Sequence, residues 1–546
     1  MVVSSNSNPG TPKPAPPAKG DGMSKAFLVC AALALSWGAR AATIDVKAFG
    51  AKADGKTQDR GAINKAIDAA VAARGGTVYF PAGTYVSGSI HLRSNITLQL
   101  EHGTVIEASP DMTSYDAVEP NQWDQFQEFG HSHWHNSLIW GEGLENVSII
   151  GGGLITGKAL HGRQSGEGGN KTLALKLCRN VTLRDFSILA GGHFGILLTG
   201  VDNLTVDNLK IDSNYDGMDV DACHNVRISN TTVNSPNDDA MVLKSSHGLG
   251  FKRSTENVTI TNVMVSGYDV GSVLDGTYTR NFKQAQDRDR PTGRIKIGTE
   301  SEGDFKNITI SNVVFDHCRG LAIESVDGSH VEDIAISNIT MRDVSTAPIF
   351  IRLDSRLRAP EGATIGSLRR VSISNVVVYD AEPRFGSIIS GIPGHDVEDV
   401  KLSDIRILYH GGLTLDQVAK QPKDLVNNFF FKDPSGAVPP REPFDTPEQE
   451  KQYPEPSMFG MLPAYGFFIR HAKGIELNNV EVGFMEEDRR PAFVLDQVNG
   501  VDFQHVKAQK AAGVSTIVLK NVENFTARGC TPLPDAQVSK ADRREM

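Results

Sequence analysis

NYDGMDVDACHNVRISNTTVNSPNDDAMVLK, residues 214–244, contains one full unit of the pattern that decides the fold. A polar turn and an Asp lead into an alternating apolar run, then an Asn corner and a second short apolar run, after which the turn and Asp return. Apolar, often β-branched side chains at a period of two are typical of strands. The stretch predicts two short strands separated by a corner, followed by a return to the first face.

The same unit recurs along most of the chain. Val181, Leu204 and Val226 open successive copies 23 and 22 residues apart, and the gap widens from Val258 to Ile308, where a loop is inserted. The copies read NITLQL, NVSIIGG, NVTLRDFSI, NLTVDNLKI, NVRISNTTV, NVTITNVMV, NITISNVVF, DIAISNITM, RVSISNVVV, DVKLSDIRI, GIELNNVEV and GVDFQHVKA. A propeller would need blades of roughly 40 residues. The sequence predicts an all-β, single-stranded, right-handed parallel β-helix whose Asn corners bond along the stack.

An N-terminal helix is expected to cap the open end of this solenoid. Gly75-Gly76 ends a run of apolar residues at helical spacing. These are Ala62, Ile63, Ala66, Ile67, Ala70 and Val71. The run lies between the strand-like segments IDVKAF (44–49) and TVYF (77–80). A helix in this place would cover a strand edge that could otherwise pair with another chain.

We divide the chain into a leader over residues 1–42 and one β-helix domain over residues 43–546. Residues 1–22 are rich in Pro, Ser and Gly and are expected to be disordered. A basic start at Met23-Ser24-Lys25, the apolar run AFLVCAALALSWGA and Ala39-Arg40-Ala41 have the pattern of a secretory signal peptide. The protein is therefore expected to be periplasmic or secreted, with no stable membrane span after cleavage. A true start at Met23 and an uncleaved N-terminal anchor stay open.

Three loop insertions interrupt the repeats, near residues 109–137, 278–293 and 411–466. The first is rich in aromatic residues and His, the second in charges, and the third is long and rich in Pro. In a solenoid, insertions gather at one face, which is often the binding face. Long loops with little secondary structure are often functional.

Composition excludes some partners and cofactors. The formal net charge of −10 argues against nucleic acid as the main partner. It does not exclude an acidic sugar, because a few local cations can dominate the field in a cleft. Beyond Cys30 of the leader, four widely separated cysteines have no metal-ligand spacing and are expected to be buried small hydrophobic residues, although a disulfide stays open. They are Cys178, Cys223, Cys318 and Cys530. The sequence implies no metal or cofactor, and oligomeric state is unknown from it.

Three carboxylates are the candidate reactive groups. Asp216 lies 22 residues before Asp238, and Asp239 follows directly. If each coil has about that length, the three side chains stack on one face, where they repel one another and raise at least one pKa. Glycoside hydrolysis needs one protonated and one ionised carboxyl group. The alternative is that Asp238-Asp239 is only a turn pair after Pro236.

With these motifs the chain resembles glycoside hydrolase family 28, the polygalacturonase-type pectin hydrolases, from about residue 46 to about residue 503. VKAFGAKADGKTQD and GGTVYFPAGTY resemble the N-terminal segment of pectin-active β-helices. Asn214-x-Asp216-Gly217 resembles the family's Asn-x-Asp motif, and Asp238-Asp239 its Asp-Asp motif, at matching separation. Lys244 fits a lysine that often follows in bacterial members.

The chain departs from the family pattern where a Gly-His-Gly motif is expected. Gly293–Glu300, GRIKIGTE, stands in its place and contains the letters of the family's later Arg-Ile-Lys motif. The next copy, Gly320–Ser325, has Ala322 and Glu324 where those cations are expected. The cations are either moved by one coil or replace the His locally, and we favour relocation. The resemblance is therefore to a bacterial branch that lacks the usual Gly-His-Gly motif.

The resemblance implies a mechanism. Asp238 would be the general acid, and Asp216 and Asp239 would hold and deprotonate the attacking water. This is inversion, with carboxyl groups expected roughly 6.5–9.5 Å apart. Arg294 and Lys296 are separated by one residue, so on a strand both side chains point to the same face. There they could bind a uronate carboxylate together.

Four further residues are candidate substrate contacts: Lys244, His193, Asn214 and Tyr278. Each has a structural alternative, since a lone His is more often structural than functional. His131, His133 and His135 in the first insertion are expected to touch sugar and not to bind metal.

The resemblance implies an inverting hydrolase that cleaves galacturonic-acid-containing glycosidic bonds of pectin, in homogalacturonan or rhamnogalacturonan. The first and third insertions suggest a blocked cleft end and action on chain ends. Two other functions stay open. One is a non-catalytic β-helix adhesin or carbohydrate-binding protein, and the other is a β-helix polysaccharide lyase.

Overall fold

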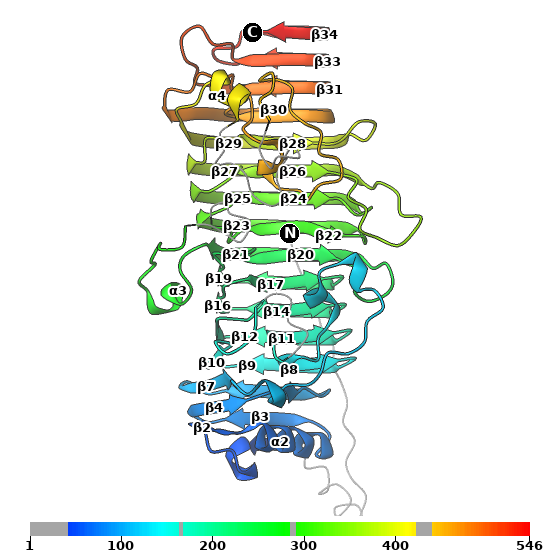
Figure 1. Cartoon of the computed structure of the whole chain (residues 1–546), viewed down its shortest axis with the longest axis vertical. Coiled ribbons are helices and arrows are strands. Elements are labelled where there is room, and N and C mark those ends of the chain that lie inside the picture. Colours follow the sequence, from blue (N-terminus) through cyan, green and yellow to red (C-terminus); the bar gives the residue numbers. More distant parts are fainter. Residues whose placement is uncertain (1–41, 163–167, 284–290, 422–438) are drawn as a thin grey trace, which may run out of the picture. The chain divides into compact units, whose positions relative to one another are not determined.

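The computed structural model describes residues 42–162, 168–283, 291–421 and 439–546. Within these ranges the chain forms one sheet system of 34 strands, nearly all paired in parallel, which coils into a stack of rungs (Figure 1). The prediction of a parallel β-helix is confirmed. The leader, apart from residue 42, lies outside the described residues, as do residues 284–290 and 422–438 of the second and third insertions.

Three series of parallel strands build the rungs. The series that carries the candidate site, here called the site sheet, consists of β5 (Ile90–His91), β8 (Ser137–Glu142), β11 (Lys171–Lys176), β14 (Phe194–Thr199), β17 (Asp216–Asp221), β20 (Met241–Ser245), β22 (Ile295–Ser301), β24 (Leu321–Ser325), β26 (Ile349–Leu353) and β28 (Ser387–Ser390). The second is β1 (Ala42–Asp45), β3 (Gly76–Phe80), β6 (Ile96–Leu100), β9 (Glu145–Ile150), β12 (Arg179–Arg184), β15 (Asp202–Asp207) and β18 (His224–Ser229). The third is β2 (Asp54–Gln58), β4 (Gly83–Ser87), β7 (Thr104–Ala108), β10 (Leu154–Thr156), β13 (Ser187–Leu189), β16 (Lys210–Asp212) and β19 (Thr232–Asn234).

In later rungs single long strands replace the short pairs. They are β21 (Thr255–Ser266), β23 (Phe305–Cys318), β25 (His330–Val344), β27 (Ser367–Ala381), β29 (Val397–Gly411), β30 (Phe467–Glu486), β31 (Phe493–Gln504), β33 (Ile517–Arg528) and β34 (Ala536–Glu545). The short strand β32 (Lys507–Ala508) pairs with β30. β30 and β31 also continue the site sheet. β34 runs antiparallel to β33 and ends the stack, which the parallel repeat did not predict.

The parallel register decides which side chains share a face. Met218 on β17 pairs with Met241 on β20, and Met241 pairs with Ile295 on β22. These three are buried in the core inside the coil. Because side chains alternate along a strand, Asp219 and Lys296 point to the opposite, outer face of the same sheet. Each repeat therefore brings its polar positions next to those of its neighbours, about 4.8 Å away.

Asn residues form the corners, as predicted. Asn146 and Asn180 adopt positive φ angles of 57° and 55°, a region that Asn tolerates better than most residues. The Asn180 side-chain amide donates to Asn146 Oδ1 at 2.9 Å, and the Asn203 amide donates to Asn180 Oδ1 at 3.1 Å. The corners therefore bond along the stack.

The N-terminal helix is also where the periodicity predicts it. α2 (Arg60–Ala72) buries Ile63, Ala66, Ile67 and Ala70 against the first rungs. The expected strand at 44–49 is only partly correct. β1 ends at Asp45, whose carboxylate accepts from the Lys47 amide and caps the short 3₁₀ helix η1 (Val46–Phe49).

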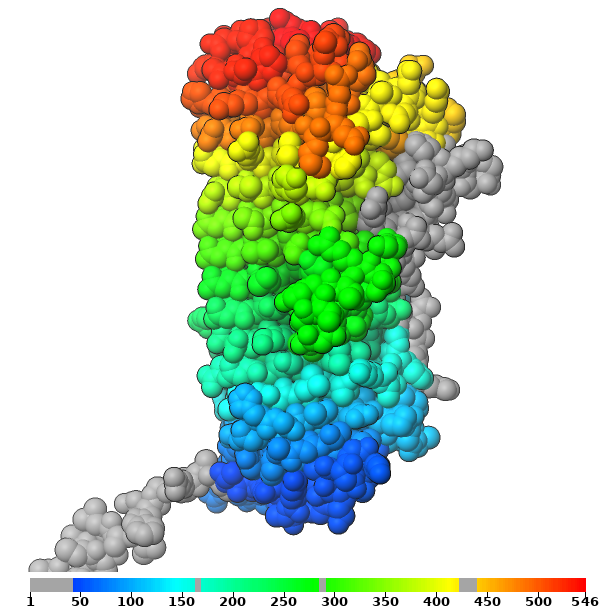
Figure 2. Space-filling model, turned by 90° about the vertical axis from the view of Figure 1, so that its left-hand side faces the viewer, coloured from blue at the N-terminus to red at the C-terminus, as the bar shows by residue number. Residues whose placement is uncertain are grey.

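The insertions contain short helices. η2 (Met112–Ser114), η3 (Asp124–Phe126) and η4 (Phe129–Ser132) lie in the first, α3 (Ser272–Asp275) precedes the second, and α4 (Leu415–Lys420) and η6 (Pro456–Phe459) lie in the third. Figure 2 shows the α3 region, in green, projecting from the stacked rungs.

The remaining structural expectations concern cysteines and membrane spans. Cys178, Cys223 and Cys318 are buried as free thiols, and Cys530 is free and partly buried. Among the described residues, no helix has the length and apolar character needed to cross a bilayer.

Candidate active site

The candidate site lies on the outer face of the site sheet, at the start of β17 and β20. Asp216 opens β17, and Asp238 and Asp239 come just before β20 on the next rung. The Gly217 amide donates to the Asp239 carbonyl at 3.0 Å, which fixes this register. The structure thus brings the three carboxylates together. One oxygen of each lies within 4.8 Å of an oxygen of the others.

The close approach of these oxygens has a structural cause. The separation of roughly 6.5–9.5 Å that the resemblance implies is between whole carboxyl groups and stays a prediction. Asp216 Oδ1 and Asp238 Oδ1 both accept from the Asp239 amide, at 3.2 and 3.0 Å, and this shared donor draws the side chains together. One water can still bridge two oxygens so separated at ordinary hydrogen-bond lengths.

Asp239 is held by two cations. Arg294 Nε donates to Asp239 Oδ1 at 2.7 Å, and Lys296 Nζ contacts Asp239 Oδ2. Burial alone would raise the pKa of Asp239, but Arg294 and Lys296 hold it well below its usual range. Asp239 therefore stays anionic, with both oxygens engaged.

Arg294 and Lys296 lie on one face, as the alternation predicts, but the protein itself supplies their partners. Both bind Asp239, and the Arg294 guanidinium also contacts Glu455 from the third insertion. Lys296 Nζ lies 3.5 Å from Tyr453 Oη. Both cations are almost fully buried.

Lys244 forms a second centre of charge beside the first. Its Nζ lies 2.9 Å from Asp219 Oδ2, 3.3 Å from Glu300 Oε2 and 3.6 Å from Asp216 Oδ2. Burial alone would lower the pKa of Lys244, but these carboxylates raise it well above its usual range. Burial raises the pKa of Asp219 to about 6, although Lys244 opposes this.

His131 reaches the Lys244 centre from the first insertion. Its Nε2 contacts Lys244 Nζ and lies 3.0 Å from Asp219 Oδ2. Burial lowers the pKa of His131 to about 4, and Lys244 adds to this effect. His193 is fully buried beside Phe194, with Nε2 3.5 Å from Glu128 Oε2. Neither imidazole is exposed on the surface.

Asp238 is the most accessible member of the carboxylate trio. It is half-buried, as are its neighbours Asn214, Tyr215 and Asn237, whereas Asp216 and Asp239 are buried. The Gly293 amide donates to the Asp238 carbonyl at 2.9 Å. The carboxyl group nearest to solvent is thus the one that the resemblance assigns as general acid.

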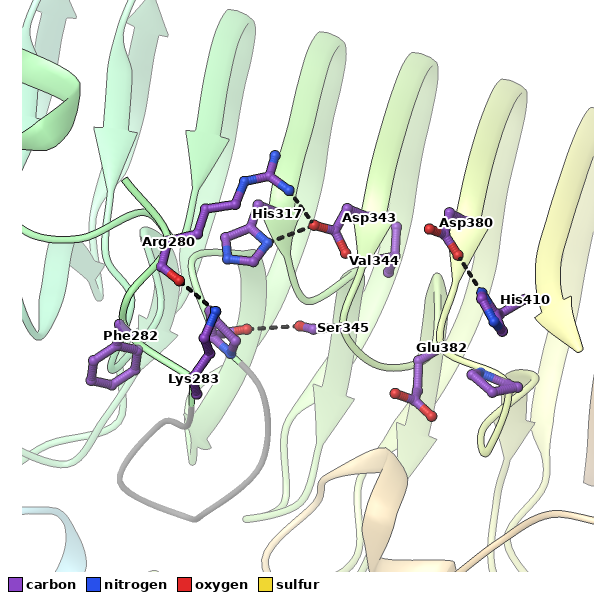
Figure 3. Close-up of a pocket in the computed structure, with 12 residues that line it drawn as sticks. Arg280, Phe282, Lys283, His317, Asp343, Val344, Ser345, Asp380, Glu382 and His410 are labelled. Carbon is purple, nitrogen blue, oxygen red and sulfur yellow. Dashed lines mark hydrogen bonds and ion pairs between the residues drawn. The ribbon is translucent and has the colours of Figure 1, made fainter. Parts of the chain in front are cut away.

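Tyr278 lies apart from these groups. Its side chain is 53% exposed, and its ring packs edge-on against Tyr268. The segment that follows it lines a separate pocket of about 480 Å³ at the strand ends (Figure 3). There Arg280 donates to Asp343 at 2.8 Å, and His317 contacts the same carboxylate.

The first insertion crosses the outer face of the site sheet. Asn121 donates to the Gly248 carbonyl on the opposite rim at 3.0 Å. Arg358, also on that rim, donates to the Phe126 carbonyl at 2.9 Å and pairs with Glu300. Trp134 packs on Ala174, Phe194 and Leu197, which closes this face on the N-terminal side of the carboxylates.

The third insertion covers the C-terminal side. Glu450 accepts from Ser355 on the far rim at 2.7 Å, and η6 then runs back across the sheet. Its apolar side chains pack on outward-facing residues of the site sheet and its continuation. The cluster contains Met458, Phe459, Met461, Leu462, Phe350, Ile388, Phe468 and Val494. Both ends of the face are therefore covered, and the carboxylates lie between the covers.

Glu324 is a further buried acid on β24. It is 0% exposed, and neither carboxylate oxygen has a hydrogen-bond partner among the described residues. Burial raises its pKa to about 8, although Lys296 and Arg294 oppose this.

Comparisons with known proteins show what the chain is similar to. Residues 43–188 match a family model described as rhamnogalacturonase A/epimerase, pectate lyase-like, and residues 135–284 match the right-handed β-helix region. Over 330 residues the chain is 23% identical to a probable polygalacturonase of Vitis vinifera. This match covers 56% of this chain and 62% of the relative. Over 386 residues it is 26% identical to a polygalacturonase of Prunus persica, covering 67% of this chain and 87% of the relative. The chain contains a right-handed β-helix region and is similar to polygalacturonases.

A solved structure agrees with the β-helix fold. A family 28 exopolygalacturonase from Yersinia enterocolitica superposes with a TM-score of 0.59 at 18% identity, covering 85% of this chain and 78% of that one. The likeness, with the β-helix model, shows a right-handed parallel β-helix. The chain spans 62% of the length of the Vitis vinifera relative.

Sequence reasoning missed several residues of this candidate site. Asp219 could have been found, because the alternation in DGMDVD places it on the same face as Lys296. Asp219 pairs with Val242 on the next rung, and Val242 pairs with Lys296 on the rung after that. Glu300 follows the irregular part of β22, and Glu455 and Tyr453 lie in an insertion without periodicity. No sequence pattern indicated their places.

Proposed function

We propose that this protein is a pectin-degrading glycoside hydrolase that cleaves galacturonic-acid-containing glycosidic bonds by inversion. The observation that carries the proposal is the meeting of Asp216, Asp238 and Asp239 across two stacked rungs. Their surroundings differ, since Asp239 is bound by two cations and is buried, whereas Asp238 is only partly buried. Acid and base roles in one site require such differences between carboxyl groups.

In this mechanism Asp238 donates its proton to the glycosidic oxygen. Asp216, 3.6 Å from the Lys244 ammonium, accepts a proton from the attacking water. The water adds to the anomeric carbon as the bond to the leaving oxygen breaks, so the anomeric configuration inverts. Asp239 keeps its charge and, through its amide, fixes the positions of the other two carboxylates.

The covered ends of the site sheet support action on chain ends or short oligosaccharides. The first insertion reaches the far rim at Gly248, and the third reaches it at Ser355. A polymer that runs along the axis of the β-helix, across successive rungs, would meet the cover around Trp134 on one side and the cover around Phe459 on the other. A chain end between the covers avoids both.

The test is a digest of defined pectic oligosaccharides by the wild type and by Asp238→Asn. We expect the wild type to release reducing ends with inverted configuration in an early NMR spectrum, and the variant to be nearly inactive. Retained configuration would refute inversion. If neither protein acts on any pectic substrate while both still bind it, the protein is a carbohydrate-binding protein and not a hydrolase.

The binding alternative is favoured by one observation. Asp216 and Asp239 are only 3% and 2% exposed, which suits structural ion pairs as well as catalysis. A lyase would instead release an unsaturated product that absorbs in the ultraviolet and whose formation stops on adding EDTA. The same digests detect it.

We also propose that the protein is exported to the periplasm or secreted. The support is the signal-like pattern of residues 23–42. N-terminal sequencing of protein recovered from the extracellular and periplasmic fractions tests this. A cytoplasmic protein that still begins with the signal-like residues would contradict it.

A further inference from the structure

Three cations face the part of the site that lies beyond the carboxylates, toward β24. They are Arg294, Lys296 and Arg319, and each is bound by a carboxylate of the protein itself. Asp239 binds Arg294 and Lys296, and Glu455 binds Arg294 and Arg319. A uronate sugar placed here would have to compete with these internal carboxylates.

Glu455 makes the contacts that a uronate carboxylate would make. Arg294 Nη1 lies 3.2 Å from Oε2 and Arg294 Nη2 lies 2.5 Å from Oε1. Arg319 Nη1 donates to the same Oε1 at 3.0 Å. A planar guanidinium that binds both oxygens of one carboxylate is the typical arrangement for recognising such a group. Arg294 and Arg319 thus form a two-arginine cradle, already filled.

We propose that Glu455 determines specificity by occupying this cradle permanently, so that the sugar bound over β22 and β24 is uncharged. The proposal rests on the hydrolase function proposed above and names the substrate class of the same site. An uncharged sugar here is either a neutral residue that alternates with galacturonate or a methyl-esterified galacturonate.

The packing of the third insertion shows that Glu455 is fixed. The next four residues form η6, and Met458 and Phe459 of that helix are buried against Phe350 and Phe468. Glu455 itself is 3% exposed. Removing one partner from a buried ion pair leaves an uncompensated charge, which is costly. A substrate carboxylate therefore cannot simply displace it.

Glu324 is a further carboxyl group beside the cradle. It is fully buried on β24, and its raised pKa of about 8 keeps it largely protonated at neutral pH. Glu324 therefore adds little negative charge against a uronate, and the exclusion depends on Glu455.

The first experiment compares three sets of oligosaccharides of equal length: unesterified oligogalacturonates, their methyl esters, and oligosaccharides in which galacturonate alternates with a neutral deoxyhexose. We expect kcat/KM of the wild type to be roughly 100-fold lower for the unesterified set than for the better of the other two. The two remaining sets tell which uncharged sugar is preferred. Equal or higher kcat/KM for unesterified oligogalacturonates would overturn the proposal.

Calorimetry with Asp238→Asn separates this proposal from the hydrolase function. The variant is expected to bind the three sets in the same order of Kd, without turnover. If the wild type hydrolyses nothing but the order of Kd persists, the hydrolase function fails and the role of Glu455 stands. If hydrolysis occurs without any preference, the role of Glu455 fails alone.

The second experiment empties the cradle. In Glu455→Ala, galacturonate is expected to raise Tm by a few degrees through binding to Arg294 and Arg319, while galactose and chloride do not. The matched control is Glu448→Ala, on the same insertion, whose carboxylate contacts Arg470 and His471 at 3.3 and 3.1 Å. We expect galacturonate to leave its Tm and that of the wild type unchanged.

Two outcomes would contradict the role of Glu455. One is that galacturonate shifts the Tm of the wild type, Glu455→Ala and Glu448→Ala equally. The other is that it shifts the Tm of none of them. If Glu455→Ala does not fold, the isosteric Glu455→Gln is tested on the three oligosaccharide sets instead. Its preference for uncharged substrates should shrink about tenfold, and an unchanged preference would exclude the cradle as its source.

Discussion

At the scale of single residues, acids on one face of one sheet differ because cations reach them differently. Arg294 and Lys296 lower the pKa of Asp239 below its usual range. Burial raises the pKa of Asp219 to about 6, with Lys244 opposing. At Asp239 two cations outweigh burial, whereas at Asp219 burial outweighs Lys244, so the balance of burial and neighbouring cations sets the chemistry of the site.

Asp238→Asn should reduce reducing-end release by about 100- to 10,000-fold, because an amide cannot donate the proton that the leaving oxygen needs. Its Tm should change little, since Asp238 is half-buried and the Asp239 amide can still donate to the side-chain oxygen. Asp404→Asn, at an exposed corner that accepts from Asn479, is the control and should retain full activity. An Asp238→Asn protein as active as this control would exclude Asp238 as the acid.

Glu324→Gln should alter the pH dependence of stability. The folded pKa of Glu324 is about 8, above its usual value of 4.5, so the unfolded chain loses this proton first. The stability that comes from keeping Glu324 protonated is present below pH 4.5 and is lost as pH rises toward 8. The variant carries no such loss.

Thermal unfolding at several pH values measures this effect. The Tm of Glu324→Gln should match the wild type near pH 4 and exceed it increasingly between pH 5 and pH 8. The comparison at low pH is the internal control for the change of side chain. A difference in Tm that is constant across this range would contradict the raised pKa.

At the scale of elements, strands and insertions contribute in different ways. Asp216 and Asp239 could be placed from sequence, because a period of two and a 22-residue repeat fix both the face and the rung. His131 and Glu455 could not, since they come from insertions whose course depends on packing and not on periodicity. The close approach of the carboxylate oxygens could not be predicted either, because it depends on the shared hydrogen bond from the Asp239 amide.

The Asn corners give an element-scale prediction. Asn180 has φ of 55° and bonds to Asn146 and Asn203. Asn180→Ala should destabilise the fold by about 1–2 kcal/mol, because Ala is strained at this φ and both amide bonds are lost. Asn180→Gly tolerates the φ and should cost less. Urea midpoints measure both, and an Ala variant as stable as the wild type would show that the corner carries no such energy.

At the scale of the whole β-helix, the two insertions convert an open sheet face into an enclosed site. Each rung contacts mainly its neighbours, so the stack itself offers a long continuous surface. The first insertion closes that surface with Trp134, and the third closes it with the apolar cluster around Phe459. The first insertion reaches β17 and β20 through His131, and the third reaches the start of β22 through Glu455. The insertions therefore approach the carboxylates from both sides, which suits a chain end better than the middle of a polymer.

The enclosed site predicts how a pectic polymer is degraded. Because both ends of the face are covered, the protein should release one short product of constant size from chain ends, and viscosity should fall slowly for each reducing end formed. Arg358→Ala removes the bond to Phe126 that ties the first insertion to the far rim, and is expected to increase early internal cleavage. Arg369→Ala, which breaks an exposed ion pair with Glu332 away from the site, is the control. Mass spectra of early digests decide the matter, since a ladder of mixed lengths from the wild type would mean that polymers pass between the covers.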